Sequence, residues 1–400
     1  MSYQKKTTES LGSRLSGAFS GILLGLALFI GATGLLWWNE GRTTATRTAL
    51  HNTATQLVEL EKIDQINPAL EGKLVHASGS AQAKAKLSDP VFGLQVDAIR
   101  LIRKVEYYQW VEKSESKTVE KTGGSTETIT TYHYEPTWSN KPIDAKAFHD
   151  PRYQGKNTVL ASIAELDETA KEVHFGAYRL PDFLAKRINA TQVLNVQVKA
   201  EQLRLPLGSS IKNKAAVLHS NGGNVVYLAA DPAAPAIGDL RISFSMVPAE
   251  TLISLIAVQR GNTFEPFIAQ NGERVSLLSM GTESAQVMIA GKLAGNQTMA
   301  WILRAMGAAF CIAGLAIFLR PLSVLASVVP FIGSIVAAGT GFTATVAGLF
   351  WSALVIALAW IRFRPMFSLT LIALAAAVAG LLYYRKKQQK TPSLPAKKNE

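Results

Sequence analysis

Residues 15–38 read LSGAFSGILLGLALFIGATGLLWW, and the next four residues read NEGR. The first stretch contains no charged residue and exceeds the roughly 20 residues that a helix needs to cross a bilayer. A cleaved signal peptide has a shorter apolar core and a small-residue cleavage site directly after it. This core ends instead at Trp37 and Trp38. The stretch therefore predicts an uncleaved signal anchor, transmembrane helix 1, in an integral membrane protein.

The positive charge of the chain gathers at its ends and at the edges of its apolar segments. The formal net charge is +12, yet residues 15–300 are nearly neutral. Because basic flanks stay in the cytoplasm, residues 1–14 and 385–400 are predicted to be cytoplasmic tails. Residues 39–300 then form an extracytoplasmic or lumenal domain. A nearly neutral domain has no strong electrostatic footprint for DNA or RNA, so we expect no nucleic-acid partner.

A C-terminal membrane region, residues 301–384, contains four apolar segments, and the basic tail decides how many of them cross. If all four crossed, the tail would end outside, against the usual placement of basic segments. Segment 322–340 contains Pro330 and Gly333, which break or kink a helix, so we expect it to be interfacial or re-entrant. Whether it crosses stays open. With helix 1, four spans result, the other three at about 302–319, 342–361 and 366–384.

The domain at 39–300 is rich in strand-forming residues, which predicts an α+β membrane protein. Its architecture would be four transmembrane helices, one N-terminal and three C-terminal, plus a large strand-rich extracytoplasmic domain. Gly123-Gly124 and Asn271-Gly272 are typical of hairpin turns. Residues 159–173 predict a helix. A domain of about 260 residues can bury a sizeable core without disulfides.

The sequence contains no established catalytic, cofactor-binding or metal-binding motif. It has no G-x-S-x-G, H-E-x-x-H or Walker A pattern. His149-Asp150 is the best candidate for a membrane-surface hydrolase, although a turn explains this dipeptide better. The predicted spans contain no Asp, Glu, Lys or His, which disfavours a transporter, while a pore lined by backbone or hydroxyl groups stays open. We therefore expect no enzyme activity and no cofactor.

Three glycines of helix 1, Gly17, Gly21 and Gly25, share one helix face at four-residue spacing. Small residues on one face let a second helix approach closely. The second helix would belong either to this chain's own bundle or to another copy of the chain.

Charged residues beside the spans form two further predicted sites. Glu40 and Arg42 follow helix 1 directly. We expect them to fix the span–domain junction, pairing with the base of the domain or with the loop that carries Arg362 and Arg364. The basic C-terminal tail is the second site and would attract anionic lipid headgroups at roughly 1 kcal/mol per cation. Its candidate residues are Arg385, Lys386, Lys387 and Lys390.

Seven short stretches are specific when taken in order, although no single one is. They are Asn39-Glu40-Gly41-Arg42; Glu71-Gly72-Lys73-Leu74-Val75-His76; Leu87-Ser88-Asp89-Pro90 with Gly93; Tyr108-Gln109-Trp110 with Glu112; Gly238-Asp239-Leu240-Arg241 with Ser243-Phe244-Ser245; Gln259-Arg260-Gly261 with Pro266-Phe267; and Arg364-Pro365. Together they resemble the transmembrane protein 43 family, also called LUMA, over nearly the whole chain.

The resemblance implies one N-terminal span, a large lumenal or extracytoplasmic domain and three C-terminal spans. Animal members are proteins of the endoplasmic reticulum and inner nuclear membrane that organise protein complexes, with partners of the emerin and lamin type. A bacterial member would lie in the inner membrane with a periplasmic domain. The resemblance brings no catalytic residues. This chain departs from animal members in a shorter N-terminal tail and a more apolar 322–340 segment.

The leading functional prediction is a non-enzymatic membrane scaffold that organises membrane protein complexes. Its partners would be membrane lipids and either further copies of the chain or other membrane proteins. The alternative is a lipid-binding or membrane-organising module, and a membrane-surface hydrolase or a channel are the remaining options.

Overall fold

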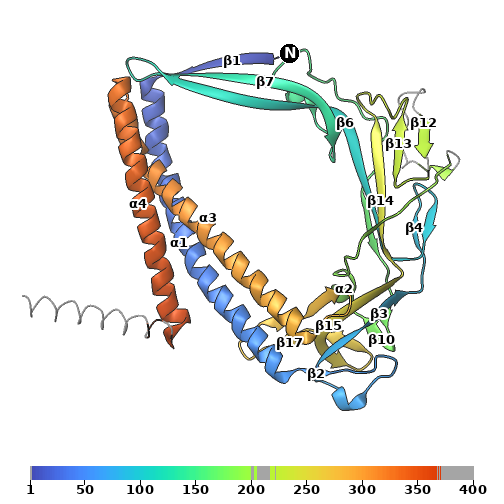
Figure 1. The fold of residues 1–400 in the computed structure, drawn as a ribbon. Helices are drawn as coiled ribbons and strands as arrows, with labels where there is room; N and C mark the ends of the chain where they lie inside the picture. Colours follow the sequence, from blue (N-terminus) through green and yellow to red (C-terminus); the bar gives the residue numbers. More distant parts are fainter. Residues whose placement is uncertain are drawn as a thin grey trace, which may run out of the picture. The chain divides into compact units, whose positions relative to one another are not determined.

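The chain folds into two compact units, which Figure 1 shows in sequence colours. The computed structural model describes residues 2–199, 202–204, 217–220 and 222–366, together with 368 and 370. The strand-rich unit consists of Met1–Ser10, Thr48–Lys121 and Ser125–Ala294. The helical unit consists of Leu11–Arg47, Thr122–Gly124 and the chain from Gly295 onward.

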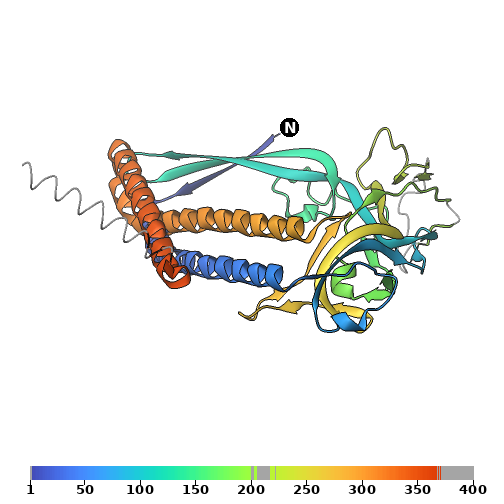
Figure 2. The same cartoon turned by 60° about the horizontal axis from the view of Figure 1, so that its bottom comes forward.

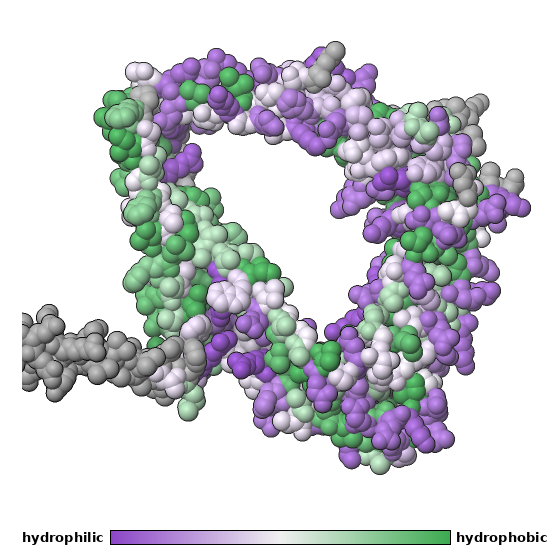
Figure 3. All heavy atoms as spheres, viewed as in Figure 1, coloured by the Kyte–Doolittle hydropathy of each residue, from purple (hydrophilic) through white to green (hydrophobic). Residues whose placement is uncertain are grey.

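Three long helices supply the helical unit. They are α1 (Leu11–Gln56), α3 (Ala285–Ala326) and α4 (Pro330–Phe363), and each is long and apolar enough to cross a membrane. The shortest, α4, has 34 residues and is about 51 Å long, more than the roughly 30 Å of a hydrocarbon core. Figures 1 and 2 show α1 and α3 side by side. On the face that Figure 3 shows, hydrophobic residues predominate on these helices, with some hydrophilic residues among them, as expected for helices that contact lipid.

The segment 322–340 is not the single interfacial or re-entrant piece that the sequence predicts. It is divided between two helices, because α3 continues to Ala326 and α4 begins at Pro330. Proline disrupts a helix interior, but it suits the first turn, where its missing amide donor has no partner to lose. Pro330 occupies that position and therefore starts a helix instead of ending one.

The number of spans also differs from the prediction of four. The predicted spans 302–319 and 342–361 lie inside α3 and α4, and the first predicted span lies inside α1. Within the described residues, three helices qualify as spans. The predicted span 366–384 lies outside the described residues, except for three positions at its start.

The larger sheet of the strand-rich unit has eight strands. Its main order is β1 (Ser2–Glu9), β7 (Thr126–Ser139), β6 (Ala98–Glu120), β14 (Leu240–Pro248), β13 (Val225–Ala229) and β12 (Val217–Ser220). Strand β8 (Leu166–Thr169) pairs with β6, and β11 (Gln192–Val193) pairs with β14. All these pairings are antiparallel.

A seven-stranded sheet forms the second layer. Its main order is β10 (Tyr178–Leu180), β9 (Val173–Phe175), β3 (Leu74–Ala83), β15 (Glu250–Arg260) and β16 (Thr263–Glu265). Strand β19 (Leu277–Met280) pairs with β15, and β2 (Val58–Glu59) pairs with β3. Because β15 begins two residues after β14 ends, the chain passes directly from one sheet to the other.

Short elements complete the unit. Two small hairpins pair β4 (Leu87–Asp89) with β5 (Leu94–Val96) and β17 (Phe267–Ile268) with β18 (Arg274–Val275). The helical turns are η1 (Pro68–Leu70), η2 (Ala145–Ala147) and α2 (Asp182–Ala185).

Strand β15 is the centre of the hydrophobic core. Successive side chains of a strand point to opposite faces, and both faces of β15 are covered. Ile253, Leu255 and Ala257 enter the main core with β3 and β9, whereas Ile256 and Val258 enter a second core. Residues Leu255–Val258 are apolar at four consecutive positions because neither face of the strand meets water there.

Two predictions about local structure can be judged here. The hairpin at Gly123-Gly124 is confirmed, since β6 and β7 pair across it, and so is the hairpin at Asn271-Gly272, between β17 and β18. The helix at 159–173 is wrong, because its residues Leu166–Thr169 form β8 and pair with β6. Pairing with an existing sheet outweighed the local helical pattern.

The sequence predicts that the N-terminal segment is a separate cytoplasmic tail, but in the structure this segment is part of the larger sheet. Ser2–Glu9 forms β1 and pairs with β7 over eight residue pairs. Lys6 forms an ion pair with Glu127 of β7 at 2.9 Å. Paired strands of one sheet normally share one aqueous compartment, so this pairing disagrees with placing the tail and the domain on opposite sides.

Candidate functional site

The most densely bonded charged cluster described in the helical unit surrounds Glu40 of α1. The Glu40 side chain is fully buried. Its Oε1 accepts a hydrogen bond from Arg304 Nε at 2.6 Å, and its Oε2 accepts from Arg304 Nη2 at 2.9 Å and Trp360 Nε1 at 2.8 Å. Arg364 Nη2 lies 3.9 Å from the same Oε2. One carboxylate therefore links α1 to α3 and to the end of α4.

Tryptophan rings cover the guanidinium groups of this cluster. The Cζ of Arg304 lies 4.8 Å from the ring centre of Trp301 and 5.8 Å from that of Trp360. The Cζ of Arg364 lies 5.8 Å from Trp360. Cation–π contacts of this kind hold the guanidinium planes in place and keep water away from the carboxylate. The lower local dielectric in turn strengthens the ion pair.

A network of amides and hydroxyls continues the cluster along α1. Asn39 Nδ2 donates to the carbonyl of Ala300 at 3.1 Å, and Asn296 Nδ2 donates to the carbonyl of Thr43 at 3.0 Å. Arg42 Nη1 donates to Asn296 Oδ1 at 3.1 Å. The polar residues that follow the first span therefore bind α3 instead of merely facing water.

The four residues predicted for the span–domain junction take different places. The structure brings Glu40 and Arg364 together and puts Arg42 in the adjoining network. Arg362 is exposed, and its Cζ lies 5.8 Å from the ring centre of Phe363. The sequence reasoning missed Arg304, although it is the only charged residue in 301–319 and so carried a signal. The junction role of these residues stays a prediction.

The three predicted packing glycines also differ from one another. A Cβ added to Gly25 would lie 2.7 Å from the carbonyl oxygen of Gly314, so α1 and α3 approach closely there. A Cβ on Gly21 would make an ordinary contact with Ile317 at 3.5 Å, and the space around Gly17 is open. Gly25 thus packs within the chain, and Gly314 was missed. The predicted lipid-binding residues Arg385, Lys386, Lys387 and Lys390 lie outside the described residues.

The candidate hydrolase residues His149 and Asp150 lie in the strand-rich unit and have different partners. His149 Nδ1 lies 2.9 Å from Glu112 Oε1, and its backbone N–H donates to Glu112 Oε2 at 2.7 Å. Asp150 pairs with Arg152 at 2.7 Å. Tyr134 Oη donates to Glu112 Oε2 and accepts from the backbone N–H of Asp150 at 2.9 Å. Glu112 is therefore the centre of this cluster.

Burial and hydrogen bonding together set the pKa values in the Glu112 cluster. Burial acts to raise the pKa of Glu112, but the donors from Tyr134 and His149 outweigh it and hold that pKa below its ordinary value. Burial and the bond to Glu112 raise the pKa of Tyr134 to about 12. An ionised Glu112 that accepts from a neutral Tyr134 is thus the stable arrangement at neutral pH. It is a structural bond between β6, β7 and the following loop.

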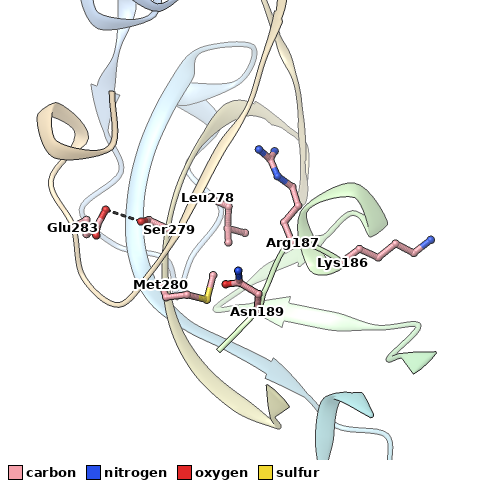
Figure 4. A pocket seen from close by; sticks show the side chains of 7 residues that line it. All are labelled: Lys186, Arg187, Asn189, Leu278, Ser279, Met280 and Glu283. Carbon is pink, nitrogen blue, oxygen red and sulfur yellow. Dashed lines mark hydrogen bonds between the residues drawn. The ribbon is translucent and has the colours of Figure 1, made fainter. Parts of the chain in front are cut away.

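An open pocket of about 650 Å³ lies beside α2 in the strand-rich unit (Figure 4). Its charged lining residues are Lys186, Arg187 and Glu283. Ser279 Oγ donates to Glu283 at 2.6 Å, and Arg187 Nη1 donates to the carbonyl of Ser276 at 2.9 Å. The lining contains no histidine beside this serine, so it lacks a serine–histidine pair for nucleophilic catalysis. In the described part of the chain, no cluster of three or more His, Cys, Asp or Glu side chains is placed to hold a metal ion.

Comparison with known proteins gives one consistent result. The sequence model of the family described as Transmembrane protein 43 matches residues 107–365. Transmembrane protein 43 of Homo sapiens is 30% identical, over 99% of this chain and 96% of its own length. The Mus musculus protein is 29% identical over 90% and 89%, and the homolog of Drosophila melanogaster is 28% identical over 92% and 95%. No solved structure was found to match.

Proposed function

The chain belongs to the transmembrane protein 43 family, and we propose that it is a non-enzymatic membrane scaffold that organises membrane protein complexes. The observation that carries this proposal is that both carboxylate oxygens of Glu40 already accept hydrogen bonds from neighbouring side chains. A catalytic or ion-carrying carboxylate has to exchange its partners during each cycle. Here Arg304 and Trp360 hold its two oxygens at 2.6–2.9 Å in a fully buried position. Such bonding favours a structural role, in which Glu40 holds α1, α3 and α4 together permanently.

The outer faces of the membrane helices support the same proposal. Several large apolar side chains of α4 are more than two-thirds exposed, among them Phe331, Phe342 and Phe350. Aromatic side chains of this size provide contact area for lipid tails or for partner helices. A rigid core with an apolar outer surface is what a platform for other membrane proteins needs.

The charge pattern supports an orientation for this scaffold. If 366–384 crosses the membrane as a third C-terminal span, a cytoplasmic basic C-terminal tail puts the domain on the extracytoplasmic side. That side is the periplasm if the chain is bacterial, or the lumen of the endoplasmic reticulum or inner nuclear membrane if it is eukaryotic. The charge pattern favours a cytoplasmic N-terminus. The β1–β7 pairing instead favours an N-terminus in the same compartment as the domain.

Mass measurement after gentle extraction tests the scaffold proposal. The full chain is purified in a mild detergent, and the mass of the protein part is compared with the 43.1 kDa of one copy. We expect the wild type to form a defined oligomer or to retain a stoichiometric membrane-protein partner. Glu40→Gln should reduce that assembly, whereas Arg362→Gln, a change at an exposed arginine, should preserve it. A strictly monomeric wild type that retains no partner would overturn the proposal.

A further inference from the structure

We propose that Arg47 and Arg364 form a binding site for one phosphate group, supplied by a phospholipid headgroup. The site lies wholly within the helical unit and uses none of the basic tail residues. It does not depend on the scaffold proposal, because it needs only the local geometry of α1 and of the residues that follow α4.

An open pocket of about 370 Å³ is lined by both arginines. Its lining is Arg47 from α1 together with Arg364, Pro365 and Met366, which directly follow α4. Arg364 Nε donates to Thr44 Oγ1 at 3.3 Å. Because Thr44 lies three residues before Arg47, both occupy one face of α1. The hydrogen bond therefore holds Arg364 beside the helix face that carries Arg47.

Positively charged side chains outnumber carboxylates around this pocket, which favours the binding of an anion. Glu40 is the only carboxylate in the described part of the helical unit, and Arg304 occupies it through two hydrogen bonds. The same end of the unit contains five arginines: Arg42, Arg47, Arg304, Arg362 and Arg364. Two guanidinium groups that line one cavity repel each other, and a bound anion converts that repulsion into attraction.

The depth of the site matches the lipid phosphate layer. Tryptophan rings concentrate at the level of the headgroups, and Arg364 lies against Trp360. Arg47 lies seven residues beyond Glu40, about 10 Å along the helix. Helical side chains point back toward the N-terminus, so the Arg47 guanidinium reaches toward the level of Arg364.

The residue types of the lining favour a phospholipid over a carboxylate-bearing solute. Guanidinium groups bind phosphate oxygens through paired donors. Pro365 and Met366 are exposed and apolar, and they supply contact for the glycerol and first methylene groups of a lipid. Free inorganic phosphate shares the charge of the headgroup but would leave these two side chains without a partner.

Native mass spectrometry of the delipidated full chain tests this site. The probe is a short-chain phosphatidylglycerol, and its Kd is taken from the bound fraction at each concentration. We expect one tight binding event in the wild type and roughly tenfold weaker binding in Arg47→Gln, which loses one charge-assisted contact. Arg47→Lys, which keeps the charge, should fall between the two. Arg362→Gln is the matched control and should bind like the wild type.

Two competitors identify the source of the phosphate. A diacylglycerol of the same chain length, which lacks phosphate, should not displace the probe. Inorganic phosphate should displace it only at much higher concentration if the ligand is a lipid, and equal potency would assign the site to free phosphate. Equal Kd values for the wild type and a folded Arg47→Gln, with unchanged Tm, would overturn the proposal.

Discussion

Glu40 and Arg304 form a two-point ion pair between residues 264 positions apart in the sequence. Nε and Nη2 of the arginine donate to Oε1 and Oε2 of the carboxylate at 2.6 and 2.9 Å. A parallel pair of charge-assisted bonds fixes orientation as well as distance. Because the Glu40 side chain is fully buried, removing its charge leaves a poorly solvated guanidinium behind.

Glu40→Gln should destabilise the helical unit. The glutamine keeps the shape but not the charge, so Arg304 loses its counter-ion, at a cost of about 3 kcal/mol. Thermal unfolding of the full chain in mild detergent, followed by circular dichroism, measures the loss as a lower Tm. The exposed Arg362→Gln should leave Tm nearly unchanged. A Tm for Glu40→Gln equal to that of the wild type would refute the proposal that Glu40 holds the helices together.

Gly25→Leu should separate α1 from α3. The first side-chain carbon alone would lie 2.7 Å from the Gly314 carbonyl oxygen, which no rotamer relieves. We expect the free energy of unfolding to fall by about 1–3 kcal/mol, as for other overpacked sites. Gly17→Leu is the control, because nothing lies within 4 Å of its added carbon. Equal Tm values for the two variants would contradict the close helix contact.

Asp89→Asn should destabilise the strand-rich unit. Asp89 is completely buried and pairs with Arg103, whose side chain is 5% exposed, at 2.6 Å. Breaking one side of such a pair costs about 3–5 kcal/mol. Asp97→Asn breaks the largely exposed pair with Lys86 and should cost about 1 kcal/mol or less. Denaturant unfolding of the two variants should therefore give clearly different midpoints, and similar midpoints would count against the buried pair.

Glu112 should make the stability of the domain sensitive to acid. Its pKa in the folded chain lies below the ordinary value of 4.5, so the ionised form stabilises the fold above that value. This contribution disappears as the pH falls through the folded-state pKa. Glu112→Gln should lower Tm near neutral pH and converge with the wild type in acid, measured between about pH 3 and 7. The exposed Glu115→Gln should follow the wild-type curve, and a constant gap for Glu112→Gln would refute the role.

Cross-linking should detect the pairing of β1 with β7. Lys6 lies opposite Ile129 in the register, at a spacing that suits a disulfide. In a Cys311→Ser background, Lys6→Cys with Ile129→Cys should cross-link on mild oxidation, whereas Lys6→Cys with His133→Cys should not. If an impermeant thiol reagent reaches positions 6 and 129 only from opposite sides of the membrane, the pairing is wrong.

The sequence predicts those features that depend on local pattern. The charge-free run 15–38 specifies a helix, and the Gly123-Gly124 pair specifies a turn, and in both cases the residues that decide the structure are contiguous in the sequence. The helix predicted at 159–173 failed because its outcome depended on a partner strand far along the chain. The site divides in the same way. Glu40 stood out beside its span, but its pairing with Arg304 depends on helix packing that spacing does not encode.

The ion pair of Glu40 with Arg304 also sets an order of events during synthesis. At about 5–20 residues per second, the 264 residues that separate the partners take roughly 13–50 s to translate. Throughout that time α1 (Leu11–Gln56) carries a carboxylate without its arginine partner, while the strand-rich unit emerges and folds. The membrane unit therefore becomes complete only after the third quarter of the chain has been made. A chain truncated before Arg304 should present Glu40 as a marker of unfinished assembly to quality-control proteases.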